Sequence, residues 1–374
     1  VYFFVMRICK TGAYPKVEAA AGRKMRMIYA EQEKWGSIGE KTVYLFQLRD
    51  AAGMALSVSN YGGIIQSWRI PEAGGAMREM VLGYDTLAEY RSSATFFGAA
   101  IGPIADRLAD GCCCVGGVRA QFPRNAGPDC MHSGPDGFHT RIWNARLLEN
   151  GIALSYQYAV GEMALPGSLR AEIRYLLLPE NTLRIEYAAE CDRETALSLT
   201  NHSYFTLSGG EAACTQDVLT VHADTYAETV FDAAPICTGR RLPVDGTPLD
   251  LRSGRVIGEV LAHADFPELR RAGGVDHFFP IDGAGMREHA RLRSEREGLE
   301  LICTSDAPGV LVYTGNGLEN ERGRQGKTYR RNYAVCLETE CFPNAINFPE
   351  HCAKVILPAG TRFASCTEFS VRHI

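Results

Sequence analysis

The sequence predicts an all-β protein of antiparallel strands, arranged as a large sandwich or a barrel, with few short helices. Apolar and polar residues alternate over short runs, the pattern of a strand with one face in a core and the other in solvent. Turn residues separate these runs, and strands recur about every ten residues, which favours a sandwich or barrel over βαβ units. Helical periodicity is scarce.

The individual elements follow from this pattern. The clearest alternating runs, each predicted to form a strand, are Met54–Val58, Ile152–Tyr158, Ile173–Tyr175 and Leu183–Tyr187. Gly, Asn or Pro residues where the chain must reverse occur at 50–53, 149–151, 179–181 and 282–283. The stretch Val256–Ala264 predicts one or two turns of helix.

The domain organisation is predicted to be simple. No repeat, low-complexity tract or Gly/Ser/Pro-rich linker interrupts the chain between about Tyr44 and the C-terminus. We therefore expect residues 27–374 to form a single domain, which is an unusually large sandwich for its class. Residues 1–26 lack a clear pattern and are treated as an N-terminal extension without an assigned role.

Composition narrows the class of protein. Hydrophobic residues make up 46% and charged residues 22% of the 374 residues, as in ordinary soluble globular proteins. The formal net charge of -5 comes from interspersed acids and bases without a basic stripe, so we do not expect a nucleic-acid partner. The apolar opening Val1–Met6 is broken by Arg7 and Lys10, and is too short for a signal peptide or a membrane span.

The cysteines indicate a reducing compartment. Their number, 13, is odd, and Cys112, Cys113 and Cys114 are consecutive. This spacing suits neither a disulfide framework nor a zinc site with paired C-x-x-C motifs. Free thiols and the lack of an export signal predict a cytoplasmic protein without a membrane partner.

Two segments depart from the strand-and-turn pattern, and in each of them one basic residue is the candidate. In 97–107, small residues crowd around Arg107, whose guanidinium can donate several hydrogen bonds to ligand hydroxyls; the alternative is a surface pair with Asp106. In 131–138, His132 lies on a Gly-rich loop, where a histidine is either merely solvated or functional.

Three further segments combine ionisable and apolar residues. His202, in the polar and aromatic run 199–210, is an acid or base candidate at neutral pH, or a buried structural histidine. Asp276 stands beside aromatic surface in 274–279, an arrangement that binds sugars, although an ordinary turn also explains it. Glu338 interrupts an apolar run, and a buried charge is costly unless it is paired or functional; the alternative is an edge strand.

Taken in this order, the segments resemble the aldose 1-epimerase (galactose mutarotase) family. The similarity extends over nearly the whole chain and includes 60–63, 81–85, the N-H-S-Y-F segment at 201–205, 312–316 and Phe369. It implies a large antiparallel β-supersandwich with an open sugar cleft. It also implies an enzyme that interconverts the α and β anomers of a free aldohexose such as galactose or glucose, with no cofactor and no metal.

The resemblance implies a role for each candidate residue. Glu338 occupies the place of the glutamate in the family's L-E-x-Q segment and is expected to act as general base. His202, in N-H-x-Y-F, is expected to protonate the ring oxygen. His132 matches the histidine of L-H-G-G, Arg107 the arginine of A-N-R-I and Asp276 the aspartate of G-x-D-H; these three are expected to bind the sugar.

Five positions depart from the family pattern. They are Pro103 for Arg, Asp106 for Asn, Ser133 for Gly, Leu311 for Gln and Glu340 for Gln. Because residues two apart on a strand share a face, Glu340 is predicted to lie near Glu338 and to raise the pKa of one of the two carboxyl groups.

Alternatives to the epimerase remain open from the sequence. The first is a related enzyme acting on hexose 6-phosphate, which needs a cationic pocket. The second is a sugar-binding sandwich without catalysis, suggested by the altered hydroxyl-binding positions. A two-carboxylate glycosidase is a third. The protein is expected to bind a monosaccharide as a monomer or homodimer.

Overall fold

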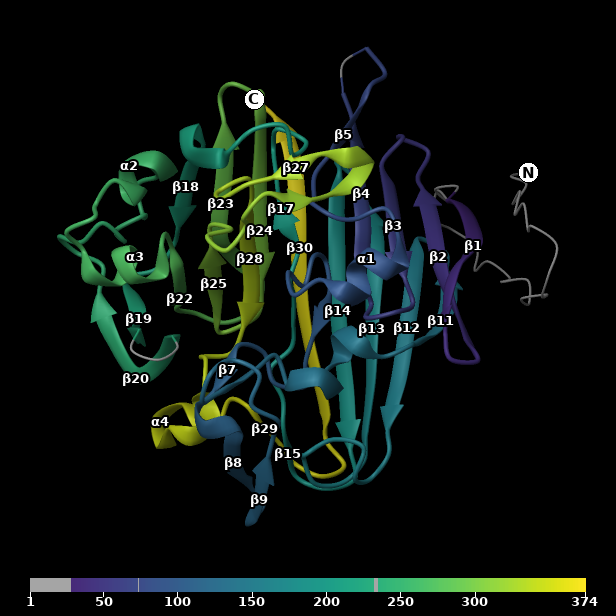
Figure 1. The fold of residues 1–374 in the computed structure, drawn as a ribbon, viewed down its shortest axis with the longest axis vertical. Helices are drawn as coiled ribbons and strands as arrows, with labels where there is room; N and C mark the ends of the chain where they lie inside the picture. The colour runs from purple at the N-terminus through teal and green to yellow at the C-terminus, as the bar shows by residue number, and fades with distance from the viewer. Residues whose placement is uncertain (1–27, 73, 232–234) are drawn as a thin grey trace.

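The computed structural model describes residues 28–72, 74–231 and 235–374, and its largest sheet has nine antiparallel strands (Figure 1). In spatial order the strands are β11 (Asn144–Leu148), β12 (Gly151–Tyr158), β13 (Leu169–Leu178), β14 (Thr182–Cys191), β30 (Arg362–His373), β24 (Leu299–Ser305), β23 (Arg287–Ser294), β18 (Val218–Val221) and β21 (Arg255–Val256). The C-terminal strand β30 pairs with β14 on one side and β24 on the other. It thereby joins the early and late parts of the chain in one sheet.

Two smaller sheets pack against this large one. The first is a five-stranded meander of β1 (Tyr29–Ile38), β2 (Lys41–Arg49), β3 (Ala55–Ser59), β4 (Ile65–Pro71) and β5 (Met77–Glu79). The second contains, in spatial order, β17 (Tyr204–Phe205), β28 (Val335–Glu340), β25 (Gly309–Tyr313) and β22 (Asp276–Pro280). One core cluster includes Trp68 of the first, Leu337 of the second and Tyr175 of the large sheet. This layered arrangement confirms the predicted all-β sandwich.

Short strand pairs and helices complete the fold. The pairs are β6 (Ala100–Ile101) with β16 (Thr200–Asn201), β7 (Arg107–Leu108) with β10 (Cys130–Met131), β8 (Cys112–Val115) with β9 (Val118–Gln121), β15 (Thr195–Ala196) with β29 (Ile356–Leu357), β19 (Thr225–Phe231) with β20 (Pro235–Pro243), and β26 (Glu321–Arg322) with β27 (Thr328–Tyr329). The helices are α1 (Leu87–Ser92), α2 (Ile257–Leu261), α3 (Pro267–Ala272) and α4 (Pro349–Cys352).

The predicted local elements are confirmed. The four alternating runs lie in β3, β12, β13 and β14, and the predicted helical stretch contains α2. Along β14 the buried Leu183, Ile185 and Tyr187 alternate with more exposed neighbours, as the period of two requires. Helix α1 was not predicted, although Thr86 and Glu89 form a capping box that marks its start.

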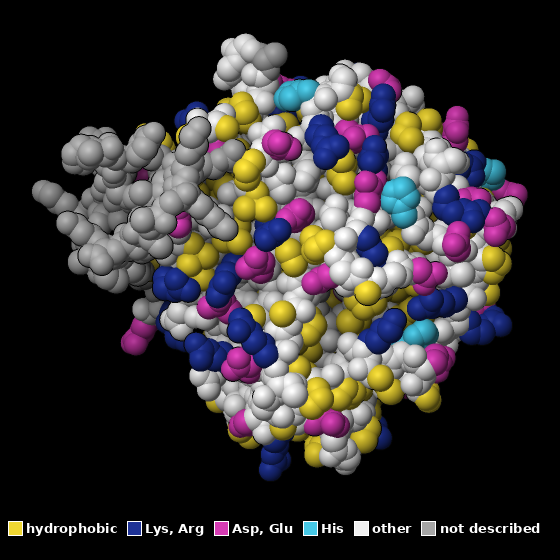
Figure 2. Space-filling model, turned by 180° about the vertical axis from the view of Figure 1, so that it is seen from behind, with side chains coloured by type: hydrophobic (Ala, Val, Ile, Leu, Met, Phe, Trp, Pro, Cys, Tyr) yellow, Lys and Arg dark blue, Asp and Glu magenta, His cyan; other side chains and the backbone are white. Residues whose placement is uncertain are grey.

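The structure tests several other predictions only in part. Every cysteine that the structure describes has a free thiol. None of the described helices has the length and apolar character needed to cross a membrane. Acidic and basic side chains are interspersed over the face shown in Figure 2. The N-terminal extension predicted at 1–26 lies outside the described residues, and the single domain stays a prediction.

Candidate active site

A cavity of about 190 Å³ lies beside the four-stranded sheet, and the structure brings all five candidate residues to its wall. Glu338 comes from β28, Asp276 from β22 and Arg107 from β7. His132 and His202 lie directly after β10 and β16. These residues are far apart in the sequence, so only the assembled sheets place them around one volume.

Strand β28 supplies the two carboxyl groups at the base of the cavity. It is an internal strand between β17 and β25, and all six of its residues are buried. Glu338 and Glu340 both line the cavity, as predicted from their spacing. Thr339 points the other way and hydrogen-bonds Thr367 of β30 at 2.6 Å. The edge-strand alternative for Glu338 is therefore wrong.

His202 and Glu338 form the central pair of the cavity. The His202 Nε2 atom lies 3.5 Å from the Glu338 Oε1 atom, and both side chains are buried. Burial, together with the charges of Asp106 and Asp276, raises the pKa of Glu338 well above its ordinary value. Burial lowers the pKa of His202 to about 3, although its own backbone opposes the shift. These opposite shifts favour the neutral form of both groups.

Aromatic rings hold the His202 imidazole in place. The Tyr204 ring stacks on it with centroids 5.1 Å apart, and the Phe96 ring stacks on it at 5.9 Å. The backbone of the Phe96 loop is also tied to His202, since the Gly98 N–H donates to the His202 carbonyl oxygen at 2.9 Å. Gly98 adopts a φ of 64°, and a Cβ there would clash with the Ile65 carbonyl oxygen, so this close approach requires glycine.

His132 is fixed by the loop that carries Arg107. The backbone N–H of Asp106 donates to His132 Nδ1 at 3.2 Å, and the His132 N–H donates to the Asp106 carbonyl oxygen at 2.9 Å. The Nε2 atom of His132 takes no part in these two hydrogen bonds. The His132 and His202 rings meet edge to face with centroids 5.4 Å apart. Burial first, then the nearby His202, His139 and Arg107, lower the pKa of His132 well below its ordinary value.

Arg107 provides the single guanidinium in the cavity wall. Its Nη1 atom lies 3.3 Å from Asp106 Oδ1, so the alternative ion pair read from the sequence exists, but in the cavity and largely buried. His277 holds the backbone of Asp276 in place. The Asp276 N–H donates to His277 Nδ1 at 3.0 Å, and His277 Nε2 lies 3.0 Å from Glu268 Oε2 of α3.

The five departures from the family pattern do not all reach the site. Asp106, Leu311 and Glu340 line the cavity. Leu311 lies directly across from Glu338 in the β25–β28 ladder. Pro103 and Ser133 lie outside the lining, and the Ser133 hydroxyl instead bonds the backbone of Ile104. The expected change in hydroxyl binding thus falls on the first three positions.

Some lining residues were not singled out from the sequence. Phe96, Met131 and Tyr313 contribute side chains to the cavity wall. The Phe96-Phe97-Gly98 run, with a bulky residue before a glycine, is the one sequence signal for Phe96. Nothing local marks Met131 or Tyr313 as lining residues, because their role depends on how the sheets assemble.

The same cavity contains atoms that suit a metal ion. Ligand atoms of His132, His202 and Glu338 lie within 4.8 Å of one another, and no other such trio occurs in the described parts of the chain. Two imidazole nitrogens and a carboxylate are a donor set that transition metals accept. They are equally the donor and acceptor set of an acid–base pair with a supporting histidine.

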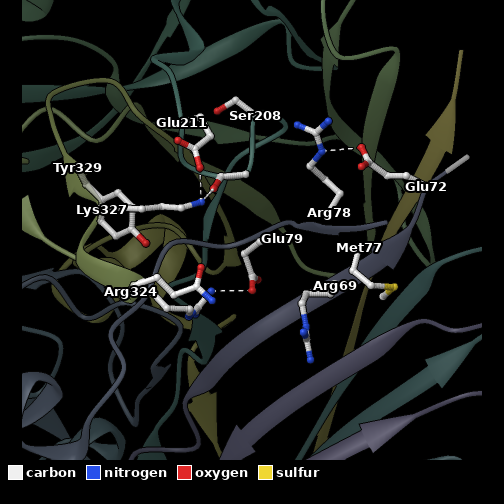
Figure 3. A pocket seen from close by; sticks show the side chains of 12 residues that line it. Arg69, Glu72, Met77, Arg78, Glu79, Ser208, Glu211, Arg324, Lys327 and Tyr329 are labelled. Carbon is white, nitrogen blue, oxygen red and sulfur yellow. Dashed lines mark hydrogen bonds and ion pairs between the residues drawn. The ribbon is translucent and has the colours of Figure 1, made fainter. Parts of the chain in front are cut away.

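A second hollow, of about 330 Å³, lies near β4, β5 and β27. Figure 3 shows ion pairs between most of its charged side chains, whereas Arg69 is drawn without one. Arg324 binds Glu79 at 2.6 Å, Lys327 binds Glu211 at 2.6 Å and Arg78 binds Glu72 at 2.7 Å. Since these three cations are already matched by carboxylates, and Arg69 is the lining cation without an ion pair in the described parts of the chain, the hollow is mainly a structural ion-pair network.

Comparison with known proteins identifies relatives over most of the chain. A family model described as aldose 1-epimerase matches residues 44–370. The galactose mutarotase of Homo sapiens is 33% identical over 347 residues, covering 92% of this chain and 97% of that protein. The aldose 1-epimerase of Escherichia coli K12 is 31% identical over 330 residues, covering 87% and 94%.

Solved structures agree with these sequence relatives. A GalM/aldose epimerase homologue from C. elegans superposes with a TM-score of 0.79 at 27% identity, covering 87% of this chain and 97% of that one. A galactose 1-epimerase from Lactobacillus acidophilus also gives a TM-score of 0.79, covering 92% and 99%. At 24% identity, the second likeness supports the fold alone.

Proposed function

This chain belongs to the aldose 1-epimerase family, and on that premise we propose that it interconverts the α and β anomers of free aldohexoses such as galactose and glucose. The observation that carries the proposal is the buried pair of Glu338 and His202, whose reactive atoms lie 3.5 Å apart in a sugar-sized cavity. A carboxylate and an imidazole facing one hemiacetal can act on its two oxygen atoms.

The reaction requires one proton to leave the sugar as another arrives. Glu338 takes the proton of the anomeric hydroxyl group, the C1=O bond forms and the C1–O5 bond breaks. His202 gives its proton to the ring oxygen, so the open aldehyde forms without a free charge. Rotation about C1–C2 presents the other face of the carbonyl group. The same two groups then run in reverse to close the ring.

The pair needs a single proton for this cycle. The raised pKa of Glu338 and the lowered pKa of His202 favour Glu338 as the holder of that proton before the sugar binds. The form that starts ring opening has the proton on His202, and the two side chains are close enough for transfer when a sugar hydroxyl bridges them. Asp276, Arg107 and His132 then orient the sugar through its remaining oxygen atoms.

The test is polarimetry of freshly dissolved α-D-galactose and α-D-glucose with wild-type protein and Glu338→Gln. A positioned acid or base contributes on the order of 100- to 10,000-fold, and the amide should lose this factor while keeping its shape. Glu300→Gln is the matched control, because Glu300 is also a buried strand glutamate but lies on β24. Equal rates for wild type and Glu338→Gln, or no acceleration over buffer, would end the proposal.

The hexose 6-phosphate alternative is disfavoured by charge. Arg107 is the single Arg or Lys among the lining residues, and Asp106 already pairs with it. A phosphate group would also face the carboxyl groups of Asp276, Glu338 and Glu340. Equal or better turnover of glucose 6-phosphate than of glucose would reverse this choice. Sugar binding in a calorimeter with no change in anomerisation would instead favour a non-catalytic protein.

Location and assembly complete the proposal. We place the enzyme in the cytoplasm, because the described cysteines are all free thiols, which persist in a reducing compartment. A monomer or homodimer is expected, and sedimentation velocity distinguishes the two.

A further inference from the structure

The wall of the cavity has more acidic than basic side chains. Four carboxyl groups line it, those of Asp106, Asp276, Glu338 and Glu340, against the single guanidinium of Arg107. The lining histidines add no positive charge near neutral pH, since burial lowers the pKa of both His132 and His202. A neutral sugar would not relieve this imbalance.

Among these acids, Glu340 has a carboxyl group that lacks hydrogen bonds within the described chain. It is 3% exposed, and both of its carboxyl oxygens are buried without a hydrogen-bond partner among the described residues. A buried carboxyl group in this state is unfavourable unless a donor or a positive charge reaches it. The single guanidinium in the cavity wall, that of Arg107, lies 3.3 Å from the carboxyl group of Asp106.

The neighbouring strand cannot supply the missing partner. Gly309 lies directly across from Glu340 on β25, and a Cβ at Gly309 would clash with the Phe278 ring. The next residue on the same face is Leu311, which has no polar atom in its side chain. Strand β25 therefore gives Glu340 no polar partner, and the carboxyl group is available to a ligand in the cavity.

The chemistry of the partner follows from these surroundings. A protonated amine offers three N–H donors and a positive charge, whereas a hydroxyl group offers one donor and no charge. We propose that the cavity binds an aldose in which a protonated amine replaces one hydroxyl group, with Glu340 as the ion-pair partner of the ammonium group. This inference rests on the proposed epimerase function and names the substrate class of that site.

Two further observations agree with a cationic substrate. The resemblance read from the sequence implies amides at the positions of Asp106 and Glu340, and this chain has carboxyl groups at both. Burial, then the charges of Asp106 and Glu338, raise the pKa of Glu340 well above its ordinary value. An ammonium group beside Glu340 would favour its ionised form and remove part of that penalty.

The first experiment measures substrate preference in the wild-type enzyme. Mutarotation is followed by polarimetry for glucose, galactose, and glucose or galactose with an amine at C2, C3 or C6. The pH lies below the pKa of the amine, ionic strength is fixed, EDTA is present and the buffer rate is subtracted. At least one amino sugar should show a kcat/KM about tenfold or more above its neutral parent, as expected for a charge-assisted hydrogen bond.

The second experiment assigns that preference to Glu340. Glu340→Gln keeps the shape of the side chain and removes its charge, so the ratio of amino-sugar to neutral-sugar kcat/KM should fall about tenfold. Glu300→Gln, which removes a buried carboxylate outside the cavity, should leave the ratio unchanged. The ratio is internal to each variant, so partial loss of folded protein does not affect it.

Each outcome bears on one proposal. If no amino sugar exceeds its parent in wild type, or if Glu340→Gln keeps the same ratio, the amino-sugar inference is wrong while the epimerase stands. If a preference appears without EDTA and vanishes with it, a divalent cation occupies the acidic site and the inference is again wrong. If neither neutral nor amino sugars are accelerated, the proposed function itself fails.

Discussion

Replacing Phe96 with alanine should raise the pKa of His202, because the Phe96 ring covers part of the imidazole. The Phe96 and His202 rings are nearly parallel, at 22°, with centroids 5.9 Å apart. Tyr204 stacks on the same imidazole at 17° and 5.1 Å, and His202 is 6% exposed. Removing one of these two rings admits water to the imidazole, and water stabilises its charged form.

The magnitude follows from the depth of burial. Burial is the largest cause of the fall in the His202 pKa from 6.5 to about 3. That fall corresponds to about 5 kcal/mol against the imidazolium form, at 1.36 kcal/mol for each pKa unit. Removing one of the two flanking rings should recover part of this free energy, so the pKa of His202 should reach roughly 4 to 5 in Phe96→Ala. The Tyr204 ring and the positive charge of Arg107 remain and keep it below 6.5.

The assay is an NMR titration of histidine with labelled imidazole carbons, in which the His202 signal is assigned by its loss in His202→Asn. The acid limb of kcat/KM should move upward with the same midpoint, because a second proton on the Glu338–His202 pair removes the base. Phe348→Ala is the matched control, since Phe348 packs edge to face on His351, away from His202. An unmoved midpoint in folded Phe96→Ala would refute burial as the cause.

Two further predictions concern stability. Burial raises the pKa of Asp217 from 3.8 to about 6, so its contribution is complete below pH 3.8 and is lost as the pH rises through about 6. The asparagine in Asp217→Asn cannot ionise. The free energy of unfolding of this variant in urea, minus that of wild type, should therefore rise by on the order of 2 kcal/mol between pH 4 and pH 7. A difference that stays constant with pH would contradict this. Arg324→Met leaves the part-buried Glu79 without its guanidinium partner and should lower the free energy of unfolding by about 2 kcal/mol. Because Arg324 lies in the hollow of Figure 3 and not in the cavity, kcat/KM per folded molecule should not change.

Local periodicity predicted those strands whose partners are close in the sequence. The ladder from β12 through β13 to β14 consists of hairpins with turn residues between the strands, so pattern and pairing coincide. The place of β30 between β14 and β24 could not be predicted in this way. Its pairing joins residues some 180 positions apart, such as Thr182 with Ser370, and no local pattern specifies such a partner.

The candidate site was predictable in residue type and only partly in environment. The period of two on a strand places Glu338 and Glu340 on one face, and both do line the cavity. The residue type predicted His202 as an acid or base candidate, or as a buried histidine, but not that burial lowers its pKa to about 3. This burial comes from Phe96, Tyr204 and Glu338 on separate segments, so it depends on the assembled fold.

Burial of the Glu338–His202 pair also explains how one pair can serve a reversible reaction. In water a histidine is a stronger base than a glutamate, so a shared proton would stay on the imidazole. Burial raises the pKa of Glu338 and lowers that of His202, which reverses this order. A bound sugar brings hydroxyl dipoles back to both groups and moves their proton affinities toward each other. Since ring opening and ring closure use the same two groups in opposite roles, every turnover requires that neither proton position be strongly favoured.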